Sequence, residues 1–275
     1  MKIVSTGSTI SSPEFYKKKL HKRRKRNTIF GFLALTLLIG AVIILRLESL
    51  RIGAISVIGA EVVGVEDVES TAKKVLSGRY LWLVPKDNAI VYPKVRLKQE
   101  LASRFPRLNS ITLSLMSLNT LTISITEREP HALYCADSTE SGVCYFLDEG
   151  GFIFDPAPAF SEGVYLTFSS EPVLENPKGI ELMPQSEFVL LSHFLAKFDD
   201  LGLEPLVINI FTDRFEARLE SGSKIIWNRG GDLALVFASL ESFLESPSIK
   251  EFPDFHERLS ILDLRTDNKV FYQFK

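Results

Sequence analysis

Residues 27–45 form an uninterrupted apolar stretch, NTIFGFLALTLLIGAVIIL, without a charged side chain. At about 1.5 Å per residue, a helix of this length covers roughly 28 Å, close to the hydrocarbon thickness of a bilayer. A soluble helix this long needs a polar face, and this stretch offers only two threonines and a terminal asparagine. The sequence therefore predicts a transmembrane helix over residues 27–46.

Basic residues crowd the amino side of this stretch. The segment KKKLHKRRKR occupies residues 17–26, whereas Arg46, Glu48 and Arg51 on the other side are sparse and mixed in sign. Lys and Arg within about 15–20 residues of a span stay on the cytoplasmic side. We therefore expect residues 1–26 to be a cytoplasmic basic tail in a single-pass protein of the cell membrane, with its main domains outside the cytoplasm.

A cleaved signal peptide is the main alternative to a retained anchor. The apolar region of a signal peptide usually spans only about 7–15 residues. The nearest small-x-small site, Ala54-Ile55-Ser56, lies inside a predicted strand. Both observations favour an anchored protein.

The charge balance bears on possible partners. The 275 residues have a net charge of −2, but the basic tail offsets an acidic exterior. A basic tail beside a span is typical of a topology signal in contact with anionic membrane lipid. An acidic exterior argues against nucleic-acid binding there. Without tail and span, about 225 residues remain, which suffices for one or two folded domains.

The sequence has two cysteines, Cys135 and Cys144, both on the predicted outer side. The segment YCADSTESGVCYF is typical of two short strands joined by a polar loop, so the sulfurs can meet across a hairpin. An oxidising compartment permits a disulfide, and no third or fourth metal ligand lies nearby in the sequence. We expect a structural disulfide rather than a redox or metal pair.

Residues 52–130 have the pattern of a small α+β domain. A strand at 52–57 precedes an amphipathic helix from about residue 65. The loop RYLWLVPKDNAI at 79–90 leads to a second helix, which begins near Pro93 and stops before Pro106. Two strands with alternating apolar side chains follow, at Ile111, Leu113 and Leu115 and at Leu121, Ile123 and Ile125. The order strand, helix, helix, strand, strand predicts two helices on one face of a sheet.

Specific segments add a family resemblance. The predicted span leads into IGAISVIG, and FPRLNSITLSL and LTISITEREPHALY follow, with Glu127, Arg128 and Pro130 at characteristic places. This arrangement resembles the POTRA domain of the FtsQ/DivIB cell-division family. His131 departs from it, because that position is usually apolar in the family. The resemblance implies a POTRA domain over residues 52–130.

Residues 131–275 continue the resemblance. CYFLDEGGFIFDP is similar to a hairpin of the family, with Asp148, Gly150 and Gly151 in the turn, and LSILDLRTDNKVFYQFK is similar to its closing strands. Between them we expect an irregular stretch at 155–184, then helices at EFVLLSHFLAKFDDLG and DLALVFASLESFL and strands at LVINI, FEARL and KIIW. The resemblance implies an FtsQ/DivIB-type β domain with two or three helices, and an α+β fold overall.

No motif for catalysis or ligand binding emerges. His193 lies on the polar side of its predicted helix and is expected to be solvated, and His131 and His256 lack partners at metal-ligand spacing. The serines fit no nucleophile motif. NRGGD at 228–232 lacks the glycine spacing of a phosphate loop and fits a turn before a helix. We expect a protein that is not an enzyme and uses no cofactor, metal or small-molecule substrate.

Two charged groups are further candidates for a site. Glu127-Arg128-Glu129 lies at the end of a predicted strand, where alternating charges are usually solvated. Asp263 and Arg265 lie beside the terminal strand, where a functional role and a structural salt bridge both remain open.

The terminal strand is the main candidate for a binding edge. KVFYQFK follows a tight turn at Asp267-Asn268 and is expected to pair with LSILDLR, which leaves one side as a candidate free edge for strand addition. Both faces carry apolar residues, more than a solvent-facing strand needs. The candidate partner-binding residues are Arg265, Thr266, Lys269, Val270, Phe271, Tyr272, Gln273 and Phe274.

The resemblance implies a non-catalytic scaffold of the bacterial divisome. Its expected partners are single-span coiled-coil proteins of the FtsB/FtsL or DivIC type, and its expected role is to help regulate septal peptidoglycan synthesis. One alternative is a POTRA-bearing factor for secretion or envelope assembly. The other is a membrane-anchored cell-wall enzyme, which requires a pocket with convergent titratable residues in the second domain.

The charge bias around the span generates a topology prediction. A reporter fused after Lys275 should be active only outside the cytoplasm. Replacing the basic residues at 17–26 with acidic ones should weaken or invert this orientation, as measured by a reporter pair active on opposite sides of the membrane. A cytoplasmic signal from the unaltered protein would contradict the assignment.

Overall fold

The computed structural model describes residues 13–136, 143–251, 258–266 and 269–275. The fold is mixed α+β, with one apolar amino-terminal helix and a large β-rich part. The chain forms two compact units. The first contains residues 1–58, 65–98 and 112–124, and the second contains residues 59–64, 99–111 and 125–275. Residues 52–130 are divided between the two units. This division therefore does not test the predicted domain boundary at 130–131.

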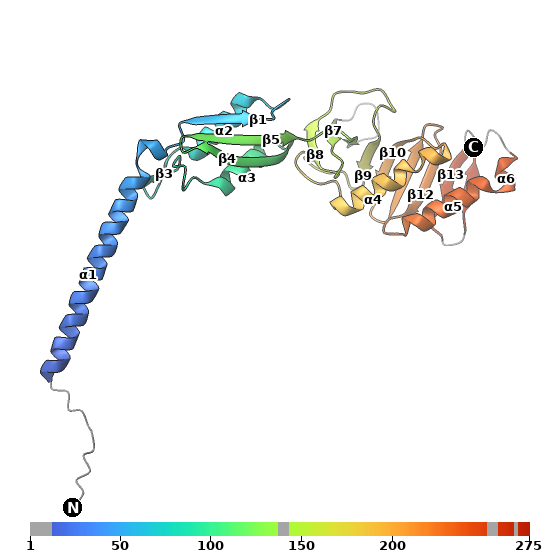
Figure 1. The fold of residues 1–275 in the computed structure, drawn as a ribbon. Helices are drawn as coiled ribbons and strands as arrows, with labels where there is room; N and C mark the ends of the chain where they lie inside the picture. Colours follow the sequence, from blue (N-terminus) through green and yellow to red (C-terminus); the bar gives the residue numbers. More distant parts are fainter. Residues whose placement is uncertain (1–12, 137–142, 252–257, 267–268) are drawn as a thin grey trace, which may run out of the picture. The chain divides into compact units, whose positions relative to one another are not determined.

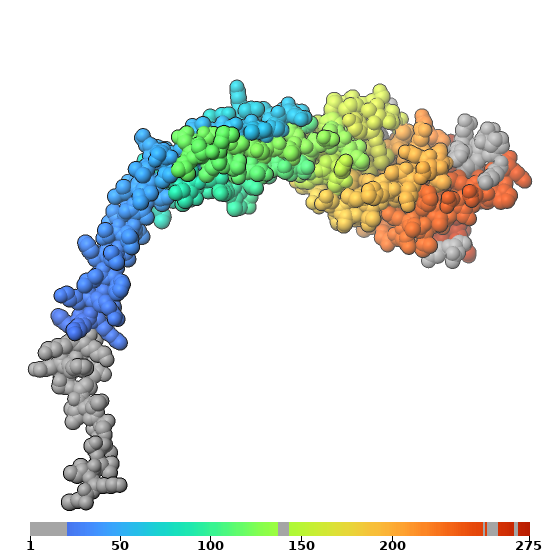
Figure 2. Space-filling view, viewed as in Figure 1, coloured from blue at the N-terminus to red at the C-terminus, as the bar shows by residue number. Residues whose placement is uncertain are grey.

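Helix α1 (Pro13–Leu45) contains residues 27–45 of the predicted span, ends one residue before the predicted end, and begins well before residue 27. It begins at Pro13, so the basic segment at 17–26 is part of the same helix. Lys and Arg are good helix formers, and Pro is favoured in the first turn of a helix. The section His21–Leu45 is long and apolar enough to cross a membrane, and none of its most apolar window is buried (Figure 2). Its length and exposure are compatible with a single-pass membrane anchor.

A three-stranded sheet follows with strand order β1-β5-β4 (Figure 1). Its strands are β1 (Ala54–Ile58), β4 (Leu108–Ser117) and β5 (Thr120–Glu127), and β1 runs parallel to β5. Helices α2 (Val65–Leu76) and α3 (Lys94–Arg104) lie between β1 and β4 in the chain. The element order is the expected one. Pro93 directly precedes α3 rather than starting it.

The first unit buries one face of α2 against the sheet. Val68, Ala72 and Leu76 recur at helical spacing and are buried, as are Leu121 and Ile123 of the central strand β5. A Val, Leu or Ile side chain contributes about 1.5–3 kcal/mol when fully removed from water. The amphipathic pattern of the sequence therefore correctly predicts helix α2 and its buried face.

The segment between α2 and α3 is not the plain loop that the sequence suggested. It contains a short antiparallel hairpin of β2 (Arg79–Tyr80) and β3 (Val84–Pro85). Its turn places Leu81 and Trp82 at positive φ, a conformation that usually calls for Gly or Asn. The sequence thus lacks the ordinary hairpin signal, which explains why pattern reasoning missed it.

The second unit is built on a nine-stranded sheet with order β14-β13-β12-β11-β10-β9-β6-β7-β8. The strands are β6 (Ala132–Cys135), β7 (Cys144–Leu147), β8 (Ile153–Pro156), β9 (Thr167–Ser170), β10 (Pro205–Ile210), β11 (Arg214–Leu219), β12 (Lys224–Asn228), β13 (Leu259–Asp263) and β14 (Phe271–Phe274). The expectation of irregular structure throughout 155–184 is wrong, because β9 lies inside the sheet. This strand is too short for its alternation to stand out.

Helices cover one face of this sheet (Figure 1). They are α4 (Gln185–Ala196), α5 (Leu233–Glu245) and the short α6 (Pro247–Lys250). A single turn of 3₁₀ helix at Asp199–Leu201 follows α4, and another at Glu48–Leu50 belongs to the first unit. The predicted apolar face of α4 is buried. At the centre, the ring of Trp227 lies 5.3 Å from Phe194 and 5.6 Å from Phe215, centroid to centroid. Sheet and helices thus share one aromatic core.

Cys135 and Cys144 form the predicted disulfide. They are opposite partners of the antiparallel pair β6 and β7. The polar loop that was expected to join these strands lies largely outside the described residues. The bond fastens the two strands at the end of their pairing.

This cross-link yields a stability prediction. Replacing both cysteines with serine should lower the free energy of unfolding by about 2–3 kcal/mol, because the bond restricts the unfolded chain. The fluorescence of buried Trp227, in a Trp82→Phe background, reports unfolding in denaturant. An unchanged midpoint would contradict a structural role, as would finding both thiols free for alkylation in protein recovered from the oxidising side.

Candidate functional site: the outer edge of strand β14

Strand β14 is the last strand at one end of the nine-stranded sheet. It pairs antiparallel with β13, with Phe271 opposite Asp263 and Tyr272 opposite Leu262. No other described strand pairs with its outer side. The predicted pairing of KVFYQFK with LSILDLR is therefore present, and it leaves a sheet edge open to the addition of a further strand.

The side chains of β14 alternate between two faces, as expected. Tyr272 points toward the helices, since its ring lies 5.3 Å from that of Phe243 in α5, and Val270 packs against the core. Phe271 and Gln273 occupy the opposite face. Phe271 is 57% exposed and Tyr272 50% exposed, although β14 is part of a folded sheet. The strand therefore presents aromatic surface to solvent on both faces.

Successive backbone amides of β14 point alternately toward β13 and toward the outer edge of the sheet. The amide of Lys275 donates to the carbonyl oxygen of Arg258, 2.8 Å away, and so points toward the neighbouring chain segment. Because successive amides point to opposite sides, the amide of Phe271 points toward β13 and that of Tyr272 points to the outer edge. Tyr272 thus supplies a main-chain donor for an added strand.

Asp263 and Arg265 form the salt bridge that the sequence left open. The Arg265 guanidinium donates to both carboxylate oxygens of Asp263, with 2.7 Å between Nη2 and Oδ2. The hydrogen bond to Arg265 lowers the pKa of Asp263 against the opposing effect of burial. Asn228 donates to the Arg265 carbonyl oxygen at 2.8 Å. These contacts fix the chain where it leaves β13.

The remaining predicted residues lie between the two strands. Arg265, Thr266 and Lys269 are exposed, and the Lys269 amide donates to the Thr266 carbonyl oxygen at 3.3 Å. The predicted turn at Asp267-Asn268 lies outside the described residues. The structure therefore brings all eight candidate residues to one end of the sheet. Sequence reasoning missed Phe243, whose only signal was its place on the amphipathic face of α5.

The expectation that Glu127-Arg128-Glu129 is solvated is wrong for two of its residues. The Glu127 side chain is only 7% exposed and lies 2.8 Å from the Arg107 guanidinium. One of its oxygens accepts hydrogen bonds from three successive backbone amides, those of residues 61–63. Arg128 pairs with Asp148, the acid of the β7–β8 turn. Glu129 alone is exposed.

This buried carboxylate has a structural role. Burial by itself raises the pKa of Glu127, but the three amides and Arg107 together outweigh it, so the net pKa lies below the ordinary value. Arg107 also donates to Asp155 at 3.3 Å. The cluster joins the end of β5, the turn after β1 and the β7–β8 hairpin within the second unit.

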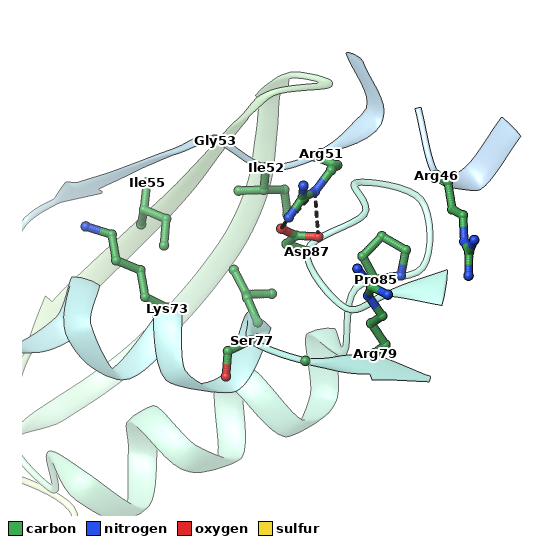
Figure 3. Close-up of a pocket in the computed structure, with 12 residues that line it drawn as sticks. Arg46, Arg51, Ile52, Gly53, Ile55, Lys73, Ser77, Arg79, Pro85 and Asp87 are labelled. Carbon is green, nitrogen blue, oxygen red and sulfur yellow. Dashed lines mark hydrogen bonds and ion pairs between the residues drawn. The ribbon is translucent and has the colours of Figure 1, made fainter. Parts of the chain in front are cut away.

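The structure describes two of the three histidines that were candidates for chemistry. His131 and His193 are exposed, and His256 lies outside the described residues. No group of three or more metal-ligating side chains occurs among the residues described. A cavity of about 550 Å³ lies in the first unit, lined by Arg46, Arg51, Lys73, Arg79 and Asp87 among others (Figure 3). Its charged lining is mainly cationic.

Comparison with known proteins leaves the chain without an assigned family. No protein-family model matches it, and no curated protein matches it either.

The Glu127 cluster predicts a pH-dependent stability. Because the folded-state pKa is lowered, the stabilisation is fully present above the unfolded value of about 4.3 and is lost as the pH falls through the folded value. Glu127→Gln should cost roughly 2–4 kcal/mol at pH 7, and the difference from the unaltered protein should shrink in acid. Denaturant unfolding between pH 7 and pH 3, followed by Trp227 fluorescence in the Trp82→Phe background, measures both effects.

Glu129→Gln is the matched control, because its carboxylate is exposed and two residues away. This variant should unfold as the unaltered protein does across the same pH range. Equal stability of the two glutamine variants at pH 7 would show that the Glu127 cluster contributes nothing.

Proposed function

We propose that this protein is a membrane-anchored scaffold, not an enzyme, that captures an extended segment of a partner protein along the outer edge of β14. The observation that carries the proposal is the position of β14. It is the end strand of a large sheet, and aromatic side chains remain exposed on both of its faces.

Strand addition provides both affinity and specificity at such an edge. A backbone carbonyl oxygen of the partner strand would accept a hydrogen bond from the outward amide of Tyr272. The partner would thereby continue the main-chain hydrogen bonding of the sheet. Phe271 on one face and Tyr272 on the other would then be covered by partner side chains, which removes apolar surface from water. The Asp263–Arg265 salt bridge holds the approach to this strand in place.

The cellular role that we propose follows from the family resemblance. The segments around Glu127 and the DLR sequence at 263–265 resemble the FtsQ/DivIB family, which implies a POTRA domain over 52–130 and a β domain over 131–275. The order of β1, α2, α3, β4 and β5 supports this assignment. We accordingly propose a divisome protein in a bacterial cell membrane, with its domains outside the cytoplasm.

The same resemblance suggests the partners. They are single-span coiled-coil proteins of the FtsB/FtsL or DivIC type, and their capture would help to regulate septal peptidoglycan synthesis. An extended segment that follows a partner's coiled coil is the kind of chain that can add to a sheet edge. Helix α1 of this chain and the partner's own span would place both proteins in the same membrane, which raises their effective concentration for each other.

Truncation tests the position of the binding edge. A chain that stops after Asp267 should insert into the membrane and fold but should no longer retain its partner, because β14 is missing. Pull-down of the full-length and truncated proteins from their own membranes measures the difference. Retention of the partner with unchanged affinity by the truncated protein would place the binding edge elsewhere.

A pair of substitutions at Tyr272 tests strand addition itself. Tyr272→Ala removes the ring and keeps the outward amide, whereas Tyr272→Pro removes both, and proline is tolerated on an edge strand. The proline variant should bind about threefold to tenfold more weakly than the alanine variant, as expected for one lost hydrogen bond. Equal affinities would argue against main-chain pairing. Phe271→Pro is the contrasting control, since it should disrupt the pairing of β14 with β13.

A further inference from the structure

The tip of the β2–β3 hairpin combines two unusual properties. Leu81 and Trp82 are 85% and 88% exposed, and both adopt positive φ, at 44° and 59°. The turn is closed by a 2.8 Å hydrogen bond from the Leu83 amide to the Tyr80 carbonyl oxygen. Asn-Gly is the usual choice for such a turn. Two large apolar residues here cost backbone strain and bury little of their side-chain surface in the fold, which points to a role outside it.

This hairpin is attached to the carboxyl end of α1. Arg46, the first residue after the helix, donates to the carbonyl oxygens of Leu83 and Trp82, at 2.7 and 3.3 Å. The buried Asn88 side chain donates at 2.9 Å to the carbonyl oxygen of Leu45, the last residue of the helix. If α1 crosses a bilayer, its end lies at the membrane surface, and these bonds hold the hairpin at that level.

The neighbouring segments strengthen the tie. The Ala89 amide donates to Leu50 at 2.8 Å, the Ile52 amide donates to Asp87 at 2.7 Å, and Arg51 forms an ion pair with Asp87. Exposed apolar side chains gather on the same segments, at Leu47, Leu81, Trp82, Leu83, Ile90 and Val91. The helix end and residues 79–92 are therefore joined by hydrogen bonds, and both carry exposed apolar side chains.

The charge around this surface suits an anionic membrane. The cavity beside the helix end is lined by Arg46, Arg51, Lys73 and Arg79, and Asp87 is its one acidic lining residue (Figure 3). Arg79 forms no ion pair among the described residues. Phosphate groups of anionic lipids attract such a cluster, and tryptophan is enriched at the interface between hydrocarbon and water.

We propose that the β2–β3 hairpin is a second membrane anchor. The side chains of Leu81 and Trp82 enter the headgroup region on the side of the bilayer where α1 ends, and the basic cavity lies against anionic lipid headgroups. The inference rests on α1 spanning the membrane and is independent of the partner proposed for β14. The bilayer is the occupant that the structure favours, because the patch is continuous with the end of the span.

Fluorescence of the full-length protein in vesicles tests this proposal. The vesicles contain phosphatidylcholine and phosphatidylglycerol, with or without a lipid that is brominated near the headgroup. The unaltered protein carries Trp82 and the buried Trp227, and Trp82→Phe removes only the exposed ring, so the difference between the two isolates Trp82. We expect bromolipid to quench the Trp82 signal at least twofold and to leave the Trp82→Phe protein unchanged.

Three outcomes would overturn parts of the proposal. Quenching of Trp82 by aqueous iodide but not by bromolipid would show that the hairpin does not touch the bilayer. Trp82 that is open to iodide in lipid vesicles yet shielded in native membranes would identify a protein as the occupant. Bromolipid quenching that stays the same without phosphatidylglycerol would contradict the role of the basic cavity.

A double substitution separates docking from folding. Leu81→Asn with Trp82→Gly installs the ordinary turn sequence, so the hairpin should form at least as well. Amide hydrogen exchange of residues 79–92 in the same vesicles should nevertheless become at least tenfold faster, because the tip no longer enters the headgroup region. Unchanged protection in this variant would show that the fold, and not the bilayer, shields the hairpin.

Discussion

Backbone hydrogen bonding at the end of α1 is the constraint on which the first unit depends. The last carbonyl groups of a helix lack partners within it, and at a membrane surface they cannot all rely on water. Asn88 supplies a partner to Leu45, and Arg46 binds the hairpin carbonyl groups in return. The Asn88 side chain is buried, whereas Arg46 is exposed. These directional hydrogen bonds restrict the direction in which the chain leaves the helix.

In the second unit, a single carboxylate accepts the hydrogen bonds of several backbone amides. Three successive amides after β1 point at one oxygen of Glu127, and Arg107 balances the charge on the other. Without these partners, the buried carboxylate of Glu127 would be costly. Their mutual satisfaction ties segments distant in sequence without a large apolar contact. It also explains why a Glu-Arg pair at a strand end has a structural role here.

Much of the fold follows from periodicity, and the exceptions have physical causes. The helical spacing on α2 and α4 and the alternation on β4, β5 and β11 predict these elements, since burial of one face decides them. Strand β9 is too short to show alternation, and the β2–β3 turn lacks its ordinary residues. The burial of Glu127 depends on amides more than sixty residues away. For the candidate site, the strand and its partner β13 are predictable, whereas the Phe243 contact depends on tertiary packing.

The open edge of β14 has a consequence for the protein on its own. An edge strand with exposed aromatic residues can pair along its open side with the same strand of a second copy as well as with a foreign segment. Confinement to a membrane would bring copies together in two dimensions and favour this self-association. A partner that covers β14 would therefore do more than bind. It would keep copies of this chain from assembling with one another, so the ratio of the two proteins would set how much of the chain remains monomeric.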